Sequence, residues 1–289
     1  MIIAELRCSV FLTWILQLAS KGDTIDMIII GEKLNGTIKS VGEAIAKKDS
    51  EFIRNLAIKQ ANAGANYLDV CAGTEQSVEV DTLKWMVDIV QEAVETPICI
   101  DNPNPHTLAQ LIPYLKKPGL INSVSGEGNK CEILYPLAKE YGFDVIALTI
   151  DDAGIPKTSE HRIEIAASLI EKAAHHGLGP ERLYIDPLVI AVSTANSSVL
   201  HFVETMRAIR QKFPGVKITS GLSNISFGLP LRKLVNRNFL CLAMYEGMDS
   251  AILDPADKDI RGTLLAVDLL TGKDKNCRKF TTAFRKGEL

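Results

Sequence analysis

From residue 27 onward, short apolar runs alternate with longer segments of helical period, and the alternation repeats eight times. The runs hold few polar residues, which indicates strands that are buried on both faces, as in a parallel sheet covered by helices. Eight strand–helix units over about 260 residues predict a (β/α)8 TIM barrel of the α/β class. We expect its strands at 28–31, 67–70, 97–101, 120–124, 144–149, 183–186, 217–221 and 250–253.

The segments between these runs have recognisable helix ends. The segment 50–63 gathers its apolar residues on one face, and the segment 159–176 is expected to begin at a Ser159 cap and to end at Gly177. A doubly wound open sheet is the alternative architecture, but it usually has fewer strands and a glycine-rich first turn. The turn after the first strand, GEKLNG, lacks the GxGxxG spacing, and the sequence has no Walker A motif. The barrel is therefore the favoured fold.

Composition narrows the classes of function. A net charge of -3 without any run of Lys or Arg gives no reason to expect nucleic acid as a partner. Six cysteines are scattered without the spacing of a metal site, which favours a reducing compartment and a cytoplasmic location. The apolar run at 10–19 is too short to span a bilayer, so we expect no membrane partner. We interpret residues 1–26 as a dispensable extension and 27–289 as one domain; a secretion signal and a docking helix stay open for the extension.

Polar side chains recur where the predicted strands end, which is where such barrels keep their reactive groups. These positions hold carboxylates and amides: Glu32, Asn35, Asp69, Asp101, Asn102, Asn122, Asp151, Asp152, Asp186, Asn224 and Asp254. Cationic side chains are almost absent, the nearest being Lys33 and Lys157. A phosphate or polyanion would require Lys, Arg or glycine-rich helix N-termini, so this ring argues against such a substrate.

Carboxylates and amides suit a neutral heterocycle that carries N–H donors and carbonyl acceptors, and a pterin is such a ring. A divalent cation is the competing ligand, although oxygen-only metal sites draw several carboxylates from one neighbourhood. Here Asp alternates with Asn, and the five histidines lack ligand spacing, so we predict no tightly bound metal. Each Asp or Asn also has a simpler interpretation as a helix cap, which we favour for Asp254, while Asp151 and Asp152 are expected to be solvated.

Seven short segments share their order and spacing with a known family: IIIGEKLNG, ICIDNPN, INSVSGE, LTIDDAGIPKT, LYIDPL, GLSNISFG and VNRNFL. They resemble the pterin-binding methyltransferases that act with corrinoid proteins. This family includes the methyltetrahydrofolate:corrinoid/iron-sulfur protein methyltransferases and the tetrahydrofolate methyltransferases of glycine-betaine-type demethylation. The resemblance runs from about Met27 to the C-terminus, and residues 1–26 lie outside it.

The resemblance implies a set of ligand-binding residues. Asp101, Asn122 and Asp186 are implied to hydrogen-bond the pterin ring of tetrahydrofolate or 5-methyltetrahydrofolate. Glu32 and Asp69 are further candidates on the rim. The corrinoid is implied to arrive on a partner protein, because the base-off DxHxxG signature is absent from this sequence. Members of the family are usually homodimers, which is the expectation here.

The resemblance also implies that Asn224 is the catalytic residue and that it lies near N5, the nitrogen that receives or gives up the methyl group. A neutral amide can stabilise the changing charge at N5 without protonating the nucleophile, so it serves both directions of methyl transfer. Two positions depart from the family: Cys71 replaces an asparagine, and Phe227 replaces a glutamine. These changes favour a paralog with tetrahydrofolate as methyl acceptor in a demethylation pathway over the acetyl-CoA-forming direction.

Other functions are less consistent with the sequence. Dihydropteroate synthases share the barrel but need cations on late strands, and here the seventh and eighth strands end in GLSN and ILDP. Thiol-directed corrinoid methyltransferases use zinc held by His and Cys, and no His-x-Cys pair exists here. A non-catalytic folate-binding barrel stays open, because the polar ring predicts binding whether or not turnover follows.

Overall fold

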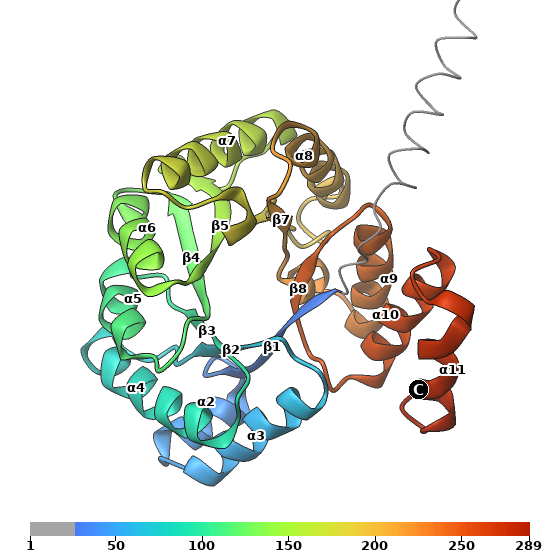
Figure 1. The fold of residues 1–289 in the computed structure, drawn as a ribbon, viewed down its shortest axis with the longest axis horizontal. Helices are drawn as coiled ribbons and strands as arrows, with labels where there is room; N and C mark the ends of the chain where they lie inside the picture. The colour runs from blue at the N-terminus through green and yellow to red at the C-terminus, as the bar shows by residue number, and fades with distance from the viewer. Residues whose placement is uncertain (1–26) are drawn as a thin grey trace, which may run out of the picture.

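The computed structural model describes residues 27–289, so the interpretation of residues 1–26 lies outside the described part of the chain. Eight parallel strands are hydrogen-bonded in the order β7-β6-β5-β4-β3-β2-β1-β8. Their bounds are β1 Ile28–Asn35, β2 Tyr67–Cys71, β3 Ile98–Asp101, β4 Leu120–Gly126, β5 Asp144–Asp151, β6 Leu183–Asp186, β7 Lys217–Ile218 and β8 Ser250–Leu253. All eight expected strands are present, and Figure 1 shows them as a ring surrounded by helices.

A bridge between Gly221 and Ile252 joins the two ends of the sheet. The amide of Ile252 donates to the carbonyl oxygen of Ser220 at 2.9 Å. The predicted (β/α)8 barrel is therefore confirmed. Strand β7 is shorter than expected, because residues 219–221 keep single hydrogen bonds to both neighbouring strands instead of forming a continuous ladder.

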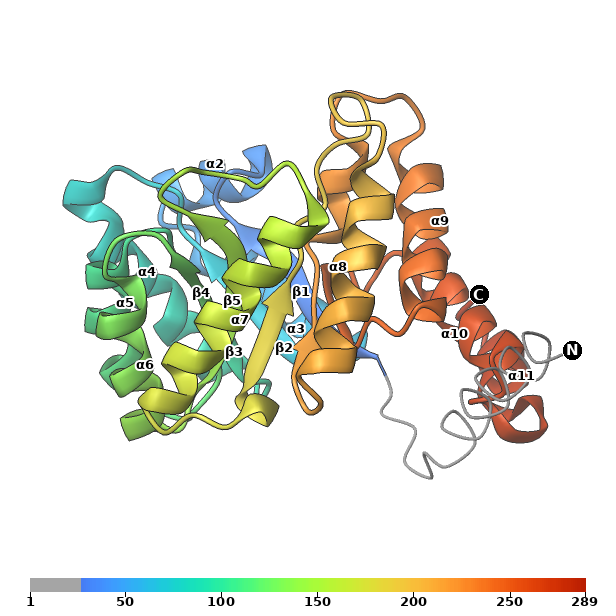
Figure 2. The same ribbon diagram turned by 90° about the horizontal axis from the view of Figure 1, so that it is seen from above.

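The outer layer consists of the helices that follow the strands. They are α2 Lys39–Ala46, α3 Ser50–Asn62, α4 Gln76–Ala93, α5 Pro105–Leu111, α6 Lys130–Tyr141, α7 Ser159–His175, α8 Ser198–Lys212, α9 Arg232–Tyr245, α10 Lys258–Leu270 and α11 Arg278–Arg285, with 3-10 turns η1 Ile112–Tyr114, η2 Pro180–Arg182, η3 Leu222–Ser226 and η4 Lys275–Cys277. Helix α11 comes after the last barrel helix and lies on the outside of α10 (Figure 2). None of the helices in residues 27–289 is long and apolar enough to cross a bilayer.

Helix α7 begins close to where the sequence predicts, but its cap is a different residue. The N-cap is Thr158, whose backbone is extended and whose hydroxyl accepts from the His161 amide at 3.3 Å. Ser159 is already helical, and its hydroxyl donates to Glu204 on α8 at 2.7 Å. The expected Ser159 cap is therefore wrong by one residue, because only the preceding residue has the non-helical backbone that capping needs.

The apolar core has two parts. The larger part lies between the strands and the helices, as the two-sided burial of the strands predicted. The smaller part fills the inside of the barrel and contains Ile30, Cys99, Leu120, Ile146 and Tyr184, with Tyr67 packed against it. This inner layer fills the barrel on the side of the amino ends of the strands, so a ligand has to enter from their carboxyl ends.

Candidate active site

Polar residues form the next layer of the barrel interior, directly above the inner apolar layer. Side chains on a strand alternate between its two faces, so the residue two positions after an inward-facing residue also faces inward. Four pairs follow this rule: Tyr67 and Asp69, Cys99 and Asp101, Leu120 and Asn122, Tyr184 and Asp186. Four of the predicted pocket residues thus share one layer at the mouth of the barrel.

Three of these residues, on β2, β3 and β4, form one cluster. Asn122 donates from Nδ2 to the Oδ1 of Asp69 at 3.1 Å, and Asn122 pairs with Asp101 in the β3–β4 register. Asp69 is only 2% exposed. Burial raises its pKa to about 6, although the Cys99 thiol and Asn122 donate hydrogen bonds that oppose the rise. A carboxyl in this state changes its charge close to neutral pH.

Asp101 is the second carboxyl of this cluster, and its charge state depends on the first. Burial and the negative charge of Asp69 raise the pKa of Asp101 well above its usual value. The thiol of Cys71 opposes this by hydrogen-bonding to the Asp101 carboxyl. Cys71 therefore retains a donor toward the pocket, a contact that the replacement of asparagine by cysteine did not suggest. Together, the carboxyls of Asp69 and Asp101 can offer both a proton donor and an acceptor to a bound ring.

Asp186 lies at the end of β6 and is 6% exposed. Its Oδ1 accepts from the amide of Leu188 at 2.8 Å. Burial raises the pKa of Asp186 to about 6, opposed by the backbone amides of Leu188 and Gly221 and by the charge of Arg162. The carboxyl is therefore fixed in position by the backbone and is ionised for the most part at pH 7.

Asn224 lies in η3, the turn that follows β7, and is exposed. Its amide Nδ2 lies so close to Gly221 that a Cβ built there would be 2.8 Å away, so only glycine gives the side chain this position. The same Gly221 donates its amide to Asp186. The candidate catalytic amide and a candidate pterin-binding carboxyl thus adjoin one glycine. Within residues 27–289 the side chain of Asn224 has no hydrogen-bond partner, which leaves the amide free to meet a ligand.

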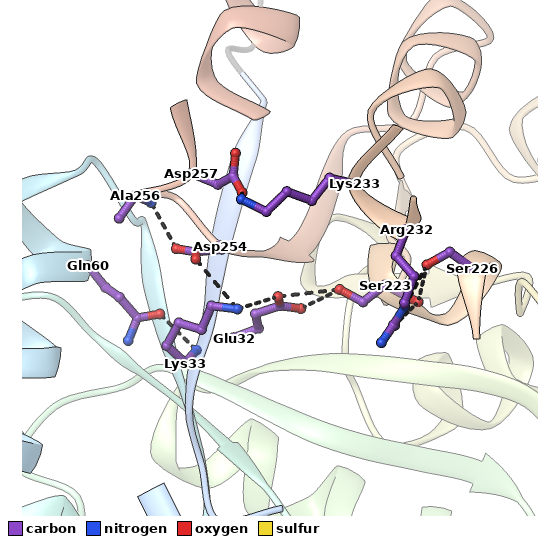
Figure 3. A network of polar contacts seen from close by, with 10 residues as sticks. All are labelled: Glu32, Lys33, Gln60, Ser223, Ser226, Arg232, Lys233, Asp254, Ala256 and Asp257. Carbon is purple, nitrogen blue, oxygen red and sulfur yellow. Dashed lines mark hydrogen bonds and ion pairs between the residues drawn. The ribbon is translucent and has the colours of Figure 1, made fainter. Parts of the chain in front are cut away.

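A network of polar contacts holds η3 against the first strand (Figure 3). Ser223 donates to Glu32 at 3.0 Å, and Lys33 lies 3.1 Å from Glu32 and 3.4 Å from Asp254. Behind the turn, Arg232 donates to the carbonyl oxygen of Ser223 at 2.9 Å. Glu32 therefore belongs to the same mouth, and its contact with Ser223 anchors the residue next to Asn224.

Asp254 has a different role from the expected helix cap. The N-cap of α10 is Asp257, which accepts from the amides of Asp259 and Ile260. Asp254 accepts instead from the Ala256 amide at 3.0 Å and faces Lys33. The cap prediction is wrong because a turn at residues 254–256 separates the strand from the helix.

One carboxylate and two cations at the mouth were not predicted from the sequence. Glu79, buried in α4, accepts a hydrogen bond from the side-chain amide of Asn102 at 2.9 Å and so orients the loop after β3. Arg232 and Arg162 add positive charge where almost none was expected, and Asp151 pairs with His161 at 2.9 Å instead of being solvated. Arg162 could have been noticed: it occupies the apolar stripe of its helix, three positions before Ile165, where a charge is unusual.

No three His, Cys, Asp or Glu side chains of residues 27–289 are arranged to hold a metal ion. The polar groups of the mouth are instead amides, thiols and carboxyls at the carboxyl ends of β2, β3, β4 and β6 and in η3. Such a set matches the alternating donors and acceptors of a heterocycle edge.

Comparisons with known proteins agree with this geometry. The chain matches the family of pterin binding enzymes over residues 31–254. It is 54% identical over 265 residues to a methylcorrinoid:tetrahydrofolate methyltransferase of Eubacterium limosum, covering 91% of this chain and 98% of that protein. It is 30% identical over 240 residues to methionine synthase of Mycobacterium tuberculosis (strain ATCC 25618 / H37Rv), covering 78% of this chain and 20% of that much longer protein.

Among solved structures, dihydropteroate synthase from Xanthomonas albilineans in complex with 7,8-dihydropteroate superposes with a TM-score of 0.63 at 16% identity. The superposition covers 86% of this chain and 94% of that one. This likeness concerns the fold. The family match spans the carboxyl ends of all eight strands and leaves out α10 and α11. The resemblance predicted from the sequence is confirmed, and the chain belongs to the family of pterin binding enzymes.

Proposed function

We propose that this protein is a methyltransferase that moves a methyl group between the cobalt of a methylated corrinoid protein and N5 of tetrahydrofolate. The observation that carries the proposal is a mouth that offers carboxyls and amides to a neutral ring, in a chain 54% identical to a methylcorrinoid:tetrahydrofolate methyltransferase along nearly its whole length. Tetrahydrofolate is the substrate, and the corrinoid belongs to the partner protein.

The pterin ring is assigned to the space between the cluster on β2, β3 and β4 and the Asp186 carboxyl on β6. Ionised Asp186 can accept two hydrogen bonds from the amino-pyrimidinone edge, since its carboxylate is fixed by the Leu188 amide. Asn122 can both donate and accept, and its contact with Asp69 sets which side of its amide faces the ring. Asp101, with its raised pKa, can donate a proton to a ring nitrogen or accept from an N–H.

Asn224 is assigned to N5. In the proposed direction the lone pair of N5 forms the new carbon–nitrogen bond while the cobalt–carbon bond breaks. Both electrons of that bond stay on cobalt, and the proton of N5 passes to solvent. The Asn224 amide has no competing partner in the described chain, so it can stabilise the charge that develops at N5. Holding the two reactants in line is the other main contribution, because proximity lowers the barrier without new chemistry.

The rim of the mouth offers a surface for the corrinoid protein. Half of the large apolar residues that are exposed in residues 27–289 lie on segments that directly follow the strand ends: Val78, Ile155, Leu200, Phe227, Leu231 and Leu234. Exposed apolar residues around the open end of a pocket suit contact with a protein. A partner seated there would bring its methyl group to the open end of the pocket.

We further propose a demethylating direction, a cytoplasmic location and a homodimer. The five described cysteines are all unpaired, in keeping with a reducing compartment. The outer face of α9, α10 and α11 exposes Leu242, Tyr245, Leu270 and Phe284 away from the mouth, which suits contact between two copies. Light scattering during size-exclusion chromatography would report a mass near twice that of the chain, and a monomer would contradict the dimer.

The test of the function is an anoxic spectrophotometric assay with purified protein, methylcob(III)alamin and tetrahydrofolate. We expect the methylcobalamin absorbance to give way to cob(I)alamin with an equal yield of 5-methyltetrahydrofolate, and the reverse reaction to be slower. Tight binding of tetrahydrofolate without transfer, even with corrinoid proteins supplied, would identify a folate-binding barrel instead. Absence of tetrahydrofolate binding would refute both.

A further inference from the structure

Arg162 is a buried cation beneath the mouth. It lies in the first turn of α7, its side chain is 1% exposed, and it is the largest fully buried side chain of residues 27–289. Burying a guanidinium away from water is costly unless every donor finds a partner. Packing alone therefore does not explain why an arginine is buried at this end of the barrel.

The guanidinium is held by backbone carbonyl oxygens of two different mouth loops. Its Nη1 donates to the carbonyl oxygens of Pro187 at 2.9 Å and Leu188 at 2.7 Å, in the loop after β6. Its Nε and Nη2 both donate to the carbonyl oxygen of Pro156 at 3.3 Å, in the loop after β5. One side chain thus ties together the two loops that flank Asp186.

The residues that Arg162 holds are the ones that fix the carboxyl of Asp186. Leu188 has a φ of +64°, a conformation that a branched side chain rarely adopts without support from its surroundings. In this conformation its amide points at Asp186 while its carbonyl oxygen points at Arg162. The guanidinium therefore stabilises the turn that presents the carboxylate.

Arg162 also acts on Asp186 through its charge. Of the charged side chains in the described chain, it is the one whose field favours the ionised form of Asp186. The other groups that act on this carboxyl are uncharged, namely the amides of Leu188 and Gly221. The hydroxyl of Thr149, on the neighbouring strand, donates to the carbonyl oxygen of Asp186 and not to its carboxyl.

We infer that Arg162 is a positioning residue for substrate binding: it holds the Asp186-Pro187-Leu188 turn and keeps the Asp186 carboxylate ready to accept hydrogen bonds from the pterin. Arg162 itself touches no substrate in this scheme. The inference rests on the proposed function for the identity of the ligand, but its structural part concerns Asp186 alone.

The test compares Arg162→Met, which removes the charge and the donors, with Arg162→Lys, which keeps the charge but cannot serve three carbonyl oxygens. Arg182→Met is the matched control. Arg182 is partly buried and, like Arg162, donates to a backbone carbonyl oxygen, that of Phe143. It lies at the opposite end of the barrel, paired with Asp144 at 2.6 Å. Melting curves establish that each variant is folded.

Two readouts follow. In ligand-free protein, the titration of the Asp186 carboxyl carbon is observed by NMR and assigned with Asp186→Asn. In parallel, the Kd for tetrahydrofolate is measured by calorimetry between pH 5.5 and 8.5. For Arg162→Met we expect the Asp186 midpoint to rise by about one pH unit and the Kd at pH 8 to increase roughly 10-fold. For Arg162→Lys the midpoint should stay near that of the wild type while the Kd still rises. Arg182→Met should change neither.

The outcomes separate the inference from the proposed function. An unchanged Asp186 midpoint and an unchanged Kd in Arg162→Met would overturn the inference while leaving the function intact. Equal changes in Arg182→Met would also overturn it, because a general loss of stability would then explain both. A shifted midpoint in Arg162→Met, combined with a wild-type protein that does not bind tetrahydrofolate, would refute the proposed function. The role of Arg162 in pterin binding would fall with it, and only its effect on Asp186 would be left.

Discussion

Replacing Asp186 by Asn is expected to stabilise the protein and to weaken folate binding at the same time. Asp186 is buried, and burial is the main reason why its pKa is raised from 3.8 to about 6. A carboxyl group that is harder to ionise in the folded protein than in the unfolded chain makes folding less favourable at every pH at which the group is charged. Asparagine has nearly the same shape as the protonated acid and removes this penalty.

The sign and size of the effect follow from the two pKa values. The unfolded chain loses this proton near pH 3.8 and the folded chain near pH 6, so stability falls as pH rises between these values and stays lower above them. A rise of about two pKa units corresponds to ~3 kcal/mol at pH 8. At pH 5 roughly half of this penalty is present, so the advantage of Asp186→Asn should shrink by ~1.4 kcal/mol between pH 8 and pH 5.

The assay is urea unfolding of wild type and Asp186→Asn at pH 5, 6.5 and 8, together with tetrahydrofolate titrations. Asp144→Asn is the control, because Asp144 pairs with Arg182 at the other end of the barrel and its replacement should destabilise. If Asp186→Asn is less stable than the wild type at pH 8, or if its advantage does not shrink toward pH 5, burial of the Asp186 carboxylate does not carry the predicted penalty. An unchanged folate affinity would show that Asp186 does not bind the ring.

Three further changes test the remaining residues. Asn224→Ala should lower kcat about 10- to 1000-fold with little change in folate affinity, as expected for one lost transition-state hydrogen bond, and full activity in a stopped-flow assay would remove Asn224 from the mechanism. Asn122→Leu removes a proposed ring contact and also a donor to Asp69, so folate binding should weaken at every pH. The pH at which the remaining affinity falls should in addition move upward, because the pKa of Asp69 rises, and an unmoved midpoint would contradict this coupling. Glu32→Gln weakens the contact with Ser223 and should reduce kcat more than KM, whereas an effect on KM alone would mean that Glu32 binds substrate directly.

Much of the fold could be predicted because its signals are local. Apolar runs and helical segments alternate over short distances, and each run of that kind is buried on both faces only in a sheet covered by helices. The ends of the predicted strands then placed Asp69, Asp101, Asn122 and Asp186 at one end of the barrel before any contact was known. The predicted cap at Ser159 is wrong by only one residue, because the end of a helix depends on backbone angles that the sequence does not specify.

The candidate site depends in contrast on contacts between distant parts of the chain. Glu32 and Ser223 are 191 residues apart in sequence, yet their hydrogen bond joins the first strand to the turn that carries Asn224. The bridge from Gly221 to Ile252 that closes the barrel is likewise visible only in three dimensions. Sequence patterns give no partner for either contact, because strand order and loop conformation decide which groups meet.

By itself, the sequence determined the architecture and the chemical type of the mouth, because periodicity and residue type are properties of single segments. Only the tertiary structure decided the charge of these groups and the support behind them. The raised pKa values of Asp69 and Asp186 come from burial by many segments together, and the hold of Arg162 on two loops comes from the way α7 packs beside them. Electrostatic energies depend on distance and on exclusion of water, and both are set by the folded chain as a whole.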